Sequence, residues 1–335
     1  MVLKYLIAID GPDPDNLALV AFSARLLGKE NLLGVLLTGR PVNKQATKET
    51  PTSEWSYSQS LDVQRTTAYR FQNFMRSYSI NADTFDGGIF PHTLVPHHLH
   101  FNDETGFCDV DLDEANKNLK LKELSELRAR IGMDRFIVLI GGPMTGLKDL
   151  LVRYPELSVQ VESVHAMYGT LGNVELMSLG GEKRGMKQFN VACDPQAGRY
   201  VIDSLKCPIY FITSDCTRDD KISFENPHAL ESFLTKNEGN DKLLSLYWAW
   251  FEKVLQPRKE KIYIHDVSTA ISASQYGSEV YEFIPVKITN FPYLPSEQKD
   301  WGVIEFKSDD KSNIYISKRL KNPNLYLNLL KEYLH

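Results

Sequence analysis

The sequence predicts an α/β fold with a central, mostly parallel sheet flanked by helices. Apolar runs rich in strand-forming residues recur along the chain, and each leads into Gly, Ser, Thr or Asp. They begin the segments 4–9, 32–39, 135–151, 174–181 and 207–217. Between the first two runs, residues 17–27 have apolar positions at helical spacing. Strand, helix and strand in this order form a βαβ unit, which builds parallel sheets.

The remaining segments are assigned in chain order. The polar segment 40–60 is expected to be a loop, 61–78 and 113–131 helices, 86–110 an irregular loop able to cover a site, 280–317 a late strand pair and 322–335 a terminal helix. Since there is no repeat or linker, we expect one domain over 1–335, with insertions near 40–60 and 86–110, and a small late β piece beside the main sheet.

Composition narrows the functional class. The chain has 335 residues, of which 42% are hydrophobic and 24% charged, as in soluble globular proteins. Its formal charge of -5 argues against nucleic acid or an anionic membrane as partner. Four separated cysteines without a CxxC pair indicate neither a zinc ribbon nor a disulfide framework, so we expect a cytoplasmic protein. No signal peptide or membrane span is predicted.

Three aspartates follow the first predicted strand, in IAIDGPDPDNLALVAF (7–22). Asp10, Asp13 and Asp15 repel one another unless something positive lies among them, and a divalent metal ion is the usual candidate. Asp10 stands at the carboxyl end of the strand, where open α/β sheets hold their ligands. The segment therefore suggests a metal site.

A second segment, KIYIHDVSTAISAS (261–274), repeats this design with an apolar strand, then His265 and Asp266, then small residues that can open a helix. Carboxylate oxygens from two distant segments suit Ca²⁺ or Mg²⁺ better than zinc. The alternative is that Asp15 and Asp266 only cap helices. Together, the two segments favour a metal.

These segments carry a family resemblance. The N-terminal segment resembles the Asp-rich signature of inosine-uridine type nucleoside hydrolases, in which a strand leads into DxDPGxDD, and IHDVSTA resembles the late His-Asp motif of that family. The other matches, in family order, are LIGGPMTGL (139–147), GNVELMSLGG (172–181) and KQFNVACDPQAGRYVI (187–202). The resemblance runs from residue 5 to about 275 and covers most of the chain.

The resemblance implies a nucleoside hydrolase-like fold, bound Ca²⁺ and hydrolysis of the N-glycosidic bond of a ribonucleoside. Asp10, Asp15, Asp266 and the backbone carbonyl of Thr145 would be the calcium ligands. Such a metal would orient the sugar hydroxyls and lower the pKa of a water molecule. Members of this family tend to form dimers or tetramers, so a homo-oligomer is expected.

Three further roles follow from the resemblance. Asn190 would hold the sugar. His265 would face the leaving base as a proton donor, a role that suits a group whose pKa lies near neutrality. His100, in HFNDETGFCDV, corresponds to a His-Gly-x-x-Gly-Leu element of the family, although the spacing here is longer.

The chain departs from the pattern at the general base. In an ungapped alignment the first Asp of DxD falls on Ala8, and the Asp that serves as base falls on Pro14. The chain then either recruits Asp13, uses another base or lacks hydrolytic activity. A shifted alignment would pair Asp15 and Asn16 with the Asp-Asp of the family, but the ungapped one keeps the spacing from Asp10 to Asp15.

Other changes surround the sugar. Arg40 replaces an amide that binds ribose, Gln188 stands where Glu is usual, and Gly146 where Asn is usual. Because arginine recognises phosphate and carboxylate, the substrate could be a nucleotide or a phosphorylated ribosyl derivative. Alternatively, Arg40 is a surface residue that pairs with an acid.

Two functional classes stay open on the sequence. One is a Ca²⁺-dependent N-ribosyl hydrolase acting on a nucleoside or a modified or phosphorylated nucleoside, or a relative that transfers the ribosyl group to another acceptor. The other is a catalytically silent protein that binds the metal and a ribosyl ligand but has lost its base at Pro14. Release of base from a nucleoside separates the two.

Overall fold

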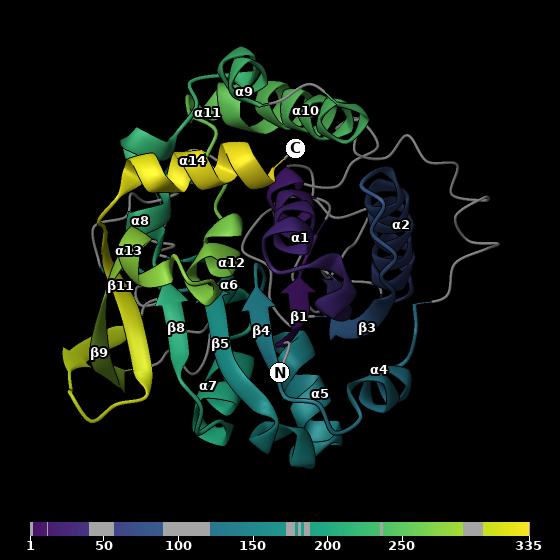
Figure 1. Ribbon diagram of the computed structural model, residues 1–335, viewed down its shortest axis with the longest axis vertical. Coiled ribbons are helices and arrows are strands. Elements are labelled where there is room, and N and C mark those ends of the chain that lie inside the picture. Colours follow the sequence, from purple (N-terminus) through teal and green to yellow (C-terminus); the bar gives the residue numbers. More distant parts are fainter. Residues whose placement is uncertain are drawn as a thin grey trace.

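The computed structural model describes residues 3–11, 13–39, 57–89, 121–171, 178–179, 182–183, 188–234, 237–290 and 304–334. Within these ranges nine strands form one sheet (Figure 1). Their order across the sheet is β10 (Glu305–Ser308), β9 (Tyr281–Asn290), β11 (Ile314–Leu320), β8 (Ile209–Ile212), β5 (Val161–Met167), β4 (Phe136–Ile140), β1 (Lys4–Ile9), β2 (Leu32–Gly39) and β3 (Thr84–Ile89). Neighbours from β11 to β3 are parallel, and β9 and β10 are antiparallel. The predicted α/β fold with a mostly parallel sheet is confirmed.

Helices cover both faces of the sheet. On one face lie α1 (Pro14–Leu26), α2 (Tyr57–Ser77), α10 (Glu238–Trp250), α12 (Val267–Ala273) and α14 (Pro323–Tyr333), and on the other α4 (Leu124–Ile131), α5 (Thr145–Arg153) and α7 (Pro195–Ser204). The other described α-helices are α6 (Phe189–Cys193), α8 (Ser214–Thr217), α9 (Pro227–Phe233), α11 (Gln256–Arg258) and α13 (Gly277–Val280). A short hairpin joins β6 (Ser178–Leu179) to β7 (Glu182–Lys183).

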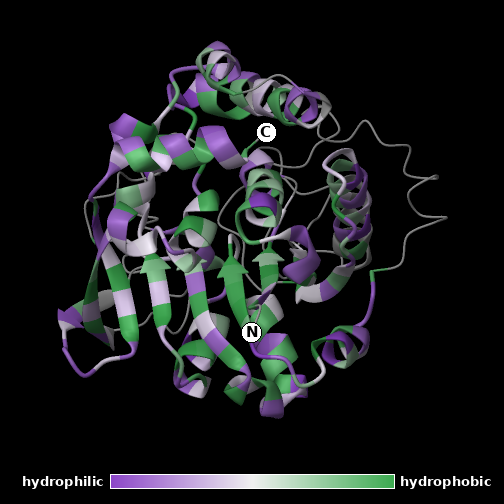
Figure 2. Ribbon diagram, viewed as in Figure 1, coloured by the Kyte–Doolittle hydropathy of each residue, from purple (hydrophilic) through white to green (hydrophobic). Residues whose placement is uncertain are grey.

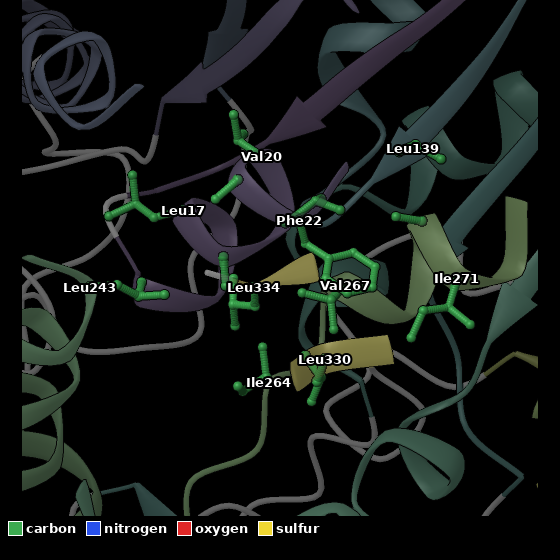
Figure 3. Packing of buried hydrophobic residues seen from close by; sticks show 14 of the residues in the cluster. Leu17, Val20, Phe22, Leu139, Leu243, Ile264, Val267, Ile271, Leu330 and Leu334 are labelled. Carbon is green, nitrogen blue, oxygen red and sulfur yellow. The ribbon is translucent and has the colours of Figure 1, made fainter. Parts of the chain in front are cut away.

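The core consists of two apolar layers, one on each face of the sheet. Alternate side chains of β1 enter different layers: Tyr5, Ile7 and Ile9 pack toward α1, and Leu6 and Ala8 toward α5. This alternation follows from the two-residue period of a strand, and burial on both faces explains why the central strands β1 and β4 are almost continuously apolar (Figure 2). Figure 3 shows how α1, α12 and α14 contribute to the first layer.

Several expected boundaries are wrong. KIYI (261–264) is not a strand: Ile262 makes a single bridge to Phe224, and the carbonyl of Ile264 accepts from the Tyr326 hydroxyl at 2.8 Å, so no sheet neighbour is available. Residues 86–89 belong to β3 and not to a loop, and the late β piece has three strands, not two. The helix expected over 113–131 begins at Leu124, and the part before residue 121 lies outside the described residues, as do 40–56 and 90–110.

The sheet reverses its order at β1. The chain passes from β1 through α1 to β2 on one side, and later places β4 on the other side of β1. At such a switch point the connections leave in opposite directions, so a crevice opens beyond the carboxyl ends of the two strands. Within the described ranges, no helix has the length and hydropathy needed to cross a bilayer.

Candidate active site

The candidate site lies where β1 and β4 end. Asp10 follows β1, and Gly141 and Gly142 follow β4, with the Gly141 amide donating to the Ala8 carbonyl at 2.9 Å. The two glycines allow close approach, because a Cβ on Gly142 would stand 2.7 Å from Cβ of Asp10. Asp10 is 4% exposed, so the sequence places a buried carboxylate at the switch point of the sheet.

Asp266 reaches the same place from the far end of the chain. It precedes α12, which packs on α1, β4 and β5. Its carboxylate oxygen Oδ2 would lie 2.9 Å from a Cβ on Gly141. Its backbone carbonyl accepts from the amide and the hydroxyl of Thr269, but its carboxylate makes no capping hydrogen bond to the described first turn of α12, so the side chain does not serve as the helix cap. Asp10 and Asp266 thus line the two successive glycines after β4.

Asn16 lies between these two acids. Its amide nitrogen Nδ2 donates to Oδ1 of Asp10 and to the carbonyl of Gly11, both at 3.4 Å. Its carbonyl oxygen Oδ1 would be 2.9 Å from a Cβ on Gly141, as is Oδ2 of Asp266. Sequence reasoning considered Asn16 only in the shifted alignment, in which it takes the place of the second Asp of the pair.

Asp15 points in another direction. One carboxylate oxygen accepts from the Tyr247 hydroxyl at 2.7 Å and the other from the backbone N–H of His265 at 3.4 Å. Burial raises its pKa to about 7, and the hydrogen bond from Tyr247 opposes the rise. Asp15 lies in the first turn of α1 but is not its N-cap, which is Asp13. Tyr247 is buried in the core, and no sequence signal pairs its hydroxyl with Asp15.

His265 is held by Thr217, at the end of α8. Its Nδ1 lies 2.8 Å from the Thr217 hydroxyl, and the ring stacks on Tyr263 with centroids 5.6 Å apart. Burial, with a smaller contribution from the charge of Arg218, lowers the pKa of His265 to about 3. The imidazole is therefore neutral at pH 7. The sequence offered no pattern that would pair Thr217 with His265.

Thr145 begins α5 and is 3% exposed. Its hydroxyl donates to Oδ2 of Asp194 at 2.7 Å, while Oδ1 of Asp194 accepts from the Ala197 amide and caps α7. Gly146 packs closely on β2 and β3, since a Cβ there would stand 3.1 Å from the Thr38 hydroxyl. The glycine that replaces the family Asn therefore permits this contact.

Asn190 is fixed at the carboxyl end of the sheet. Its Nδ2 donates to the carbonyls of Gly141 and Met167, at 3.0 and 2.9 Å. Gln188 uses both ends of its amide internally, because Oε1 accepts from the Val191 amide at 2.8 Å and Nε2 lies 3.2 Å from the Met167 sulfur. Asn190 thus adjoins the glycines that Asp10 and Asp266 line, whereas Gln188 caps α6.

The expected base Asp13 lies just before α1. It is partly buried, and its backbone carbonyl accepts from the backbone N–H of Asn16 at 3.1 Å. Its side chain makes no capping hydrogen bond to the described first turn of the helix. Pro14 is buried at the first helical position, which suits its fixed φ and missing N–H. Arg40 and His100 lie outside the described residues.

Metal-binding potential is limited to a mixed set of oxygens. Among the residues that the structure describes, no three or more His, Cys, Asp and Glu side chains gather as a metal-binding group. Oδ2 of Asp266 and Oδ1 of Asn16 lie beside Gly141, and the carboxyl group of Asp10 adjoins Gly142. All are hard donors of the kind that Ca²⁺ and Mg²⁺ accept.

Comparison with known proteins shows the family of this chain. The family model of the inosine-uridine preferring nucleoside hydrolases matches residues 65–313, a range that includes His265 and Asp266 but begins after Asp10–Asn16. Curated proteins gave no match.

Solved structures similar to this chain include the inosine-uridine preferring nucleoside hydrolase of Bacillus anthracis (13% identity, TM-score 0.61, 99% of each chain covered). A second is the plant nucleoside hydrolase PpNRh1 (15% identity, TM-score 0.67, 99% of this chain and 98% of that one covered). A third is an inosine-guanosine nucleoside hydrolase (13% identity, TM-score 0.67, 99% of each chain covered). At these identities the structures show the shared fold, whereas the family match spans most of the chain. The chain belongs to the inosine-uridine preferring nucleoside hydrolase family.

Proposed function

We propose that this protein is a Ca²⁺-dependent N-ribosyl hydrolase that cleaves the N-glycosidic bond of a nucleoside or of a modified or phosphorylated nucleoside. The observation that carries the proposal is the meeting of Asp10 and Asp266 beside Gly141 and Gly142, at the switch point of the sheet. Family membership supports the reaction class, since nucleoside hydrolases act on small nucleoside substrates.

The residues present fit a hard cation. Asp10 and Asp266 supply buried carboxylates, and the buried oxygen Oδ1 of Asn16 has no hydrogen-bond partner within the described ranges. The backbone carbonyl of Thr145 is the remaining proposed ligand, and the bond from its hydroxyl to Asp194 would hold that backbone in place. When bound, Ca²⁺ would orient the sugar hydroxyls and acidify a water molecule at the anomeric carbon.

The proton of that water needs an acceptor from the chain. Pro14 has no ionisable group, so we propose Asp13 as the general base. The carboxylate adjoins α1 at the same edge of the sheet as Asp10, and its side chain is not used to cap the helix. General base catalysis of this kind contributes about 10²–10⁴-fold in rate.

His265 would contact the leaving base. Because its pKa is lowered to about 3, the ring is neutral at pH 7 and would offer one hydrogen bond there, with Nδ1 already bonded to Thr217. Protonation of the base by His265 would require a bound substrate that raises this pKa. Asn190 would orient the sugar, and Gln188 would shape the wall behind it by capping α6. An anionic substrate bound by Arg40, and a contact from His100, remain predictions.

The test is release of base. Purified protein with added CaCl₂ is incubated with inosine, uridine, guanosine and their 5′-monophosphates, and the free base is measured by chromatography. We expect turnover of at least one substrate, loss of it in Asp10→Asn, and a decrease of about 10²-fold or more in Asp13→Ala. Turnover unchanged in Asp13→Ala would remove Asp13 as the base, and equal affinity for nucleoside and monophosphate would remove the role of Arg40.

A second candidate function is a silent binding protein, which Pro14 favours because it occupies the position of the family base. It would bind calcium and ribose but release base from no substrate. Calorimetric binding of calcium and of ribose, without turnover on the whole panel, would establish this alternative. A homo-oligomer and a cytoplasmic location are also expected from the family and the composition.

A further inference from the structure

One buried oxygen in the site has no hydrogen-bond donor. Asn16 is 2% exposed, and its Oδ1 has no hydrogen-bond partner in the part of the chain that the structure describes. Leaving such an acceptor unsatisfied destabilises the folded state, because the group loses its hydrogen bond to water on burial. An orphaned group of this kind in a native protein indicates an ion, a water or a ligand that completes it.

The direction of this oxygen identifies the kind of partner. Oδ1 of Asn16 and Oδ2 of Asp266 each lie 2.9 Å from the position of a Cβ on Gly141, so they face the same space beside a residue without a side chain. Asp10 borders this space, because its Cγ is 3.1 Å from a Cβ on Gly142 and its Oδ1 accepts from Asn16. Oxygens that face one another repel unless a cation or proton donor lies between them.

Asp15 is engaged elsewhere. Both of its oxygens accept hydrogen bonds, from the Tyr247 hydroxyl and from the His265 amide. Turning Asp15 toward Gly141 would leave the buried Tyr247 hydroxyl without this acceptor. These contacts tie α1 to α10 and to the turn before α12, and they hold the Asp15 carboxylate away from the space beside Gly141.

We propose that Asn16, in place of Asp15, supplies the third side-chain oxygen to a hard divalent cation held by Asp10 and Asp266. This inference rests on the proposed function, which requires the cation, and it assigns the third side-chain ligand to Asn16 and not to Asp15. An amide carbonyl is an accepted ligand of Ca²⁺, and it gives the site one negative charge fewer than a third carboxylate would. Affinity for calcium is therefore lower than in a site with three carboxylates, and is restored by adding the missing charge.

The test is calcium binding to the metal-stripped full chain, measured by isothermal titration calorimetry. Asn16→Leu removes the oxygen at similar volume and is expected to raise the Kd about tenfold or more, which corresponds to about 1.4 kcal/mol or more. Asn16→Asp, expected to lower the Kd about tenfold, adds a charge without removing the oxygen. Asp15→Asn tests the rival ligand directly: it removes the charge of Asp15, and its Kd is expected to stay within about threefold of that of the unchanged protein if Asp15 does not bind the cation.

Circular dichroism of each variant checks that it folds, and Asn16→Asp keeps the test decisive if Asn16→Leu does not. Loss of calcium binding in Asp15→Asn, or an unchanged Kd in both Asn16 variants, overturns the inference. If Asp10→Asn abolishes binding while the Asn16 variants bind normally, this ligand assignment fails and the proposed function stands. Absence of calcium binding by the unchanged protein overturns both the inference and the calcium dependence, whereas base release in that case still supports a hydrolase.

Discussion

His165 makes the stability of this protein depend on pH in a way that can be calculated. The residue lies on β5, is 4% exposed, and stacks on Tyr210 with ring centroids 4.8 Å apart. Nε2 and Nδ1 are hydrogen-bonded to the hydroxyls of Ser163 and Ser272, at 2.9 and 2.8 Å. Hydroxyl groups satisfy a neutral ring, and burial disfavours the charged one, so the pKa of His165 is lowered from 6.5 to about 3.

The direction in which stability changes with pH follows from proton uptake. Below pH 6.5 the unfolded chain protonates this histidine, whereas the folded protein does not until about pH 3. The unfolded state therefore binds more protons, and stability is lost as the pH falls through this window. Between pH 7.5 and 5.5 the loss from one such histidine is about 1.4 kcal/mol. His265, whose pKa is also lowered to about 3, contributes in the same direction.

The perturbation is His165→Gln, which keeps a polar side chain but removes the titration. Urea unfolding followed by circular dichroism gives the free energy of unfolding at pH 7.5 and at pH 5.5. We expect the free energy of unfolding to fall by about 1.4 kcal/mol less between pH 7.5 and pH 5.5 in His165→Gln than in the unchanged protein, whatever the stability of the variant at pH 7.5. His228→Gln, at a side chain that is 74% exposed, is the control and should lose as much as the unchanged protein. An undiminished loss in His165→Gln would refute the argument.

Three further substitutions test the scaffold of the site, each by urea unfolding. Gly142→Ala should cost about 1–3 kcal/mol, because its Cβ would stand 2.9 Å from the backbone nitrogen of Asp10, and an unchanged stability would contradict the close approach. Tyr247→Phe removes the donor to Asp15 and should destabilise by about 1.5–3 kcal/mol, whereas a neutral result would mean that water replaces the hydroxyl. Asp194→Ala removes the cap of α7 and should lower the free energy of unfolding by about 0.5–2 kcal/mol. Asp194→Asn should retain most of this capping, because Asn is also a good N-cap residue. Equal losses of stability in the two variants would count against a capping role for Asp194.

Local sequence patterns were sufficient to predict β1 and α12, the two elements that frame the site. The apolar run of β1 followed by Asp10, and the small residues that open α12 after Asp266, each contain their own signal within a few residues. The order of parallel strands places Asp10 at the carboxyl edge of the sheet, and packing of α12 on α1, β4 and β5 brings Asp266 there. KIYI (261–264) was misassigned because its apolar, strand-forming residues are typical of a strand, although only Ile262 finds a bridge partner.

The sequence by itself determined the fold class and the family and singled out Asp10 and Asp266 as candidates, because each motif that indicates them is contained in a short stretch of the chain. Only the tertiary structure decided which neighbour joins them, Asp15 or Asn16. Successive residues of a helix point about 100° apart, so the choice depends on how α1 is rotated about its axis. That rotation is set by packing of α1 against α12, α10 and α14, which arrive from the other end of the chain.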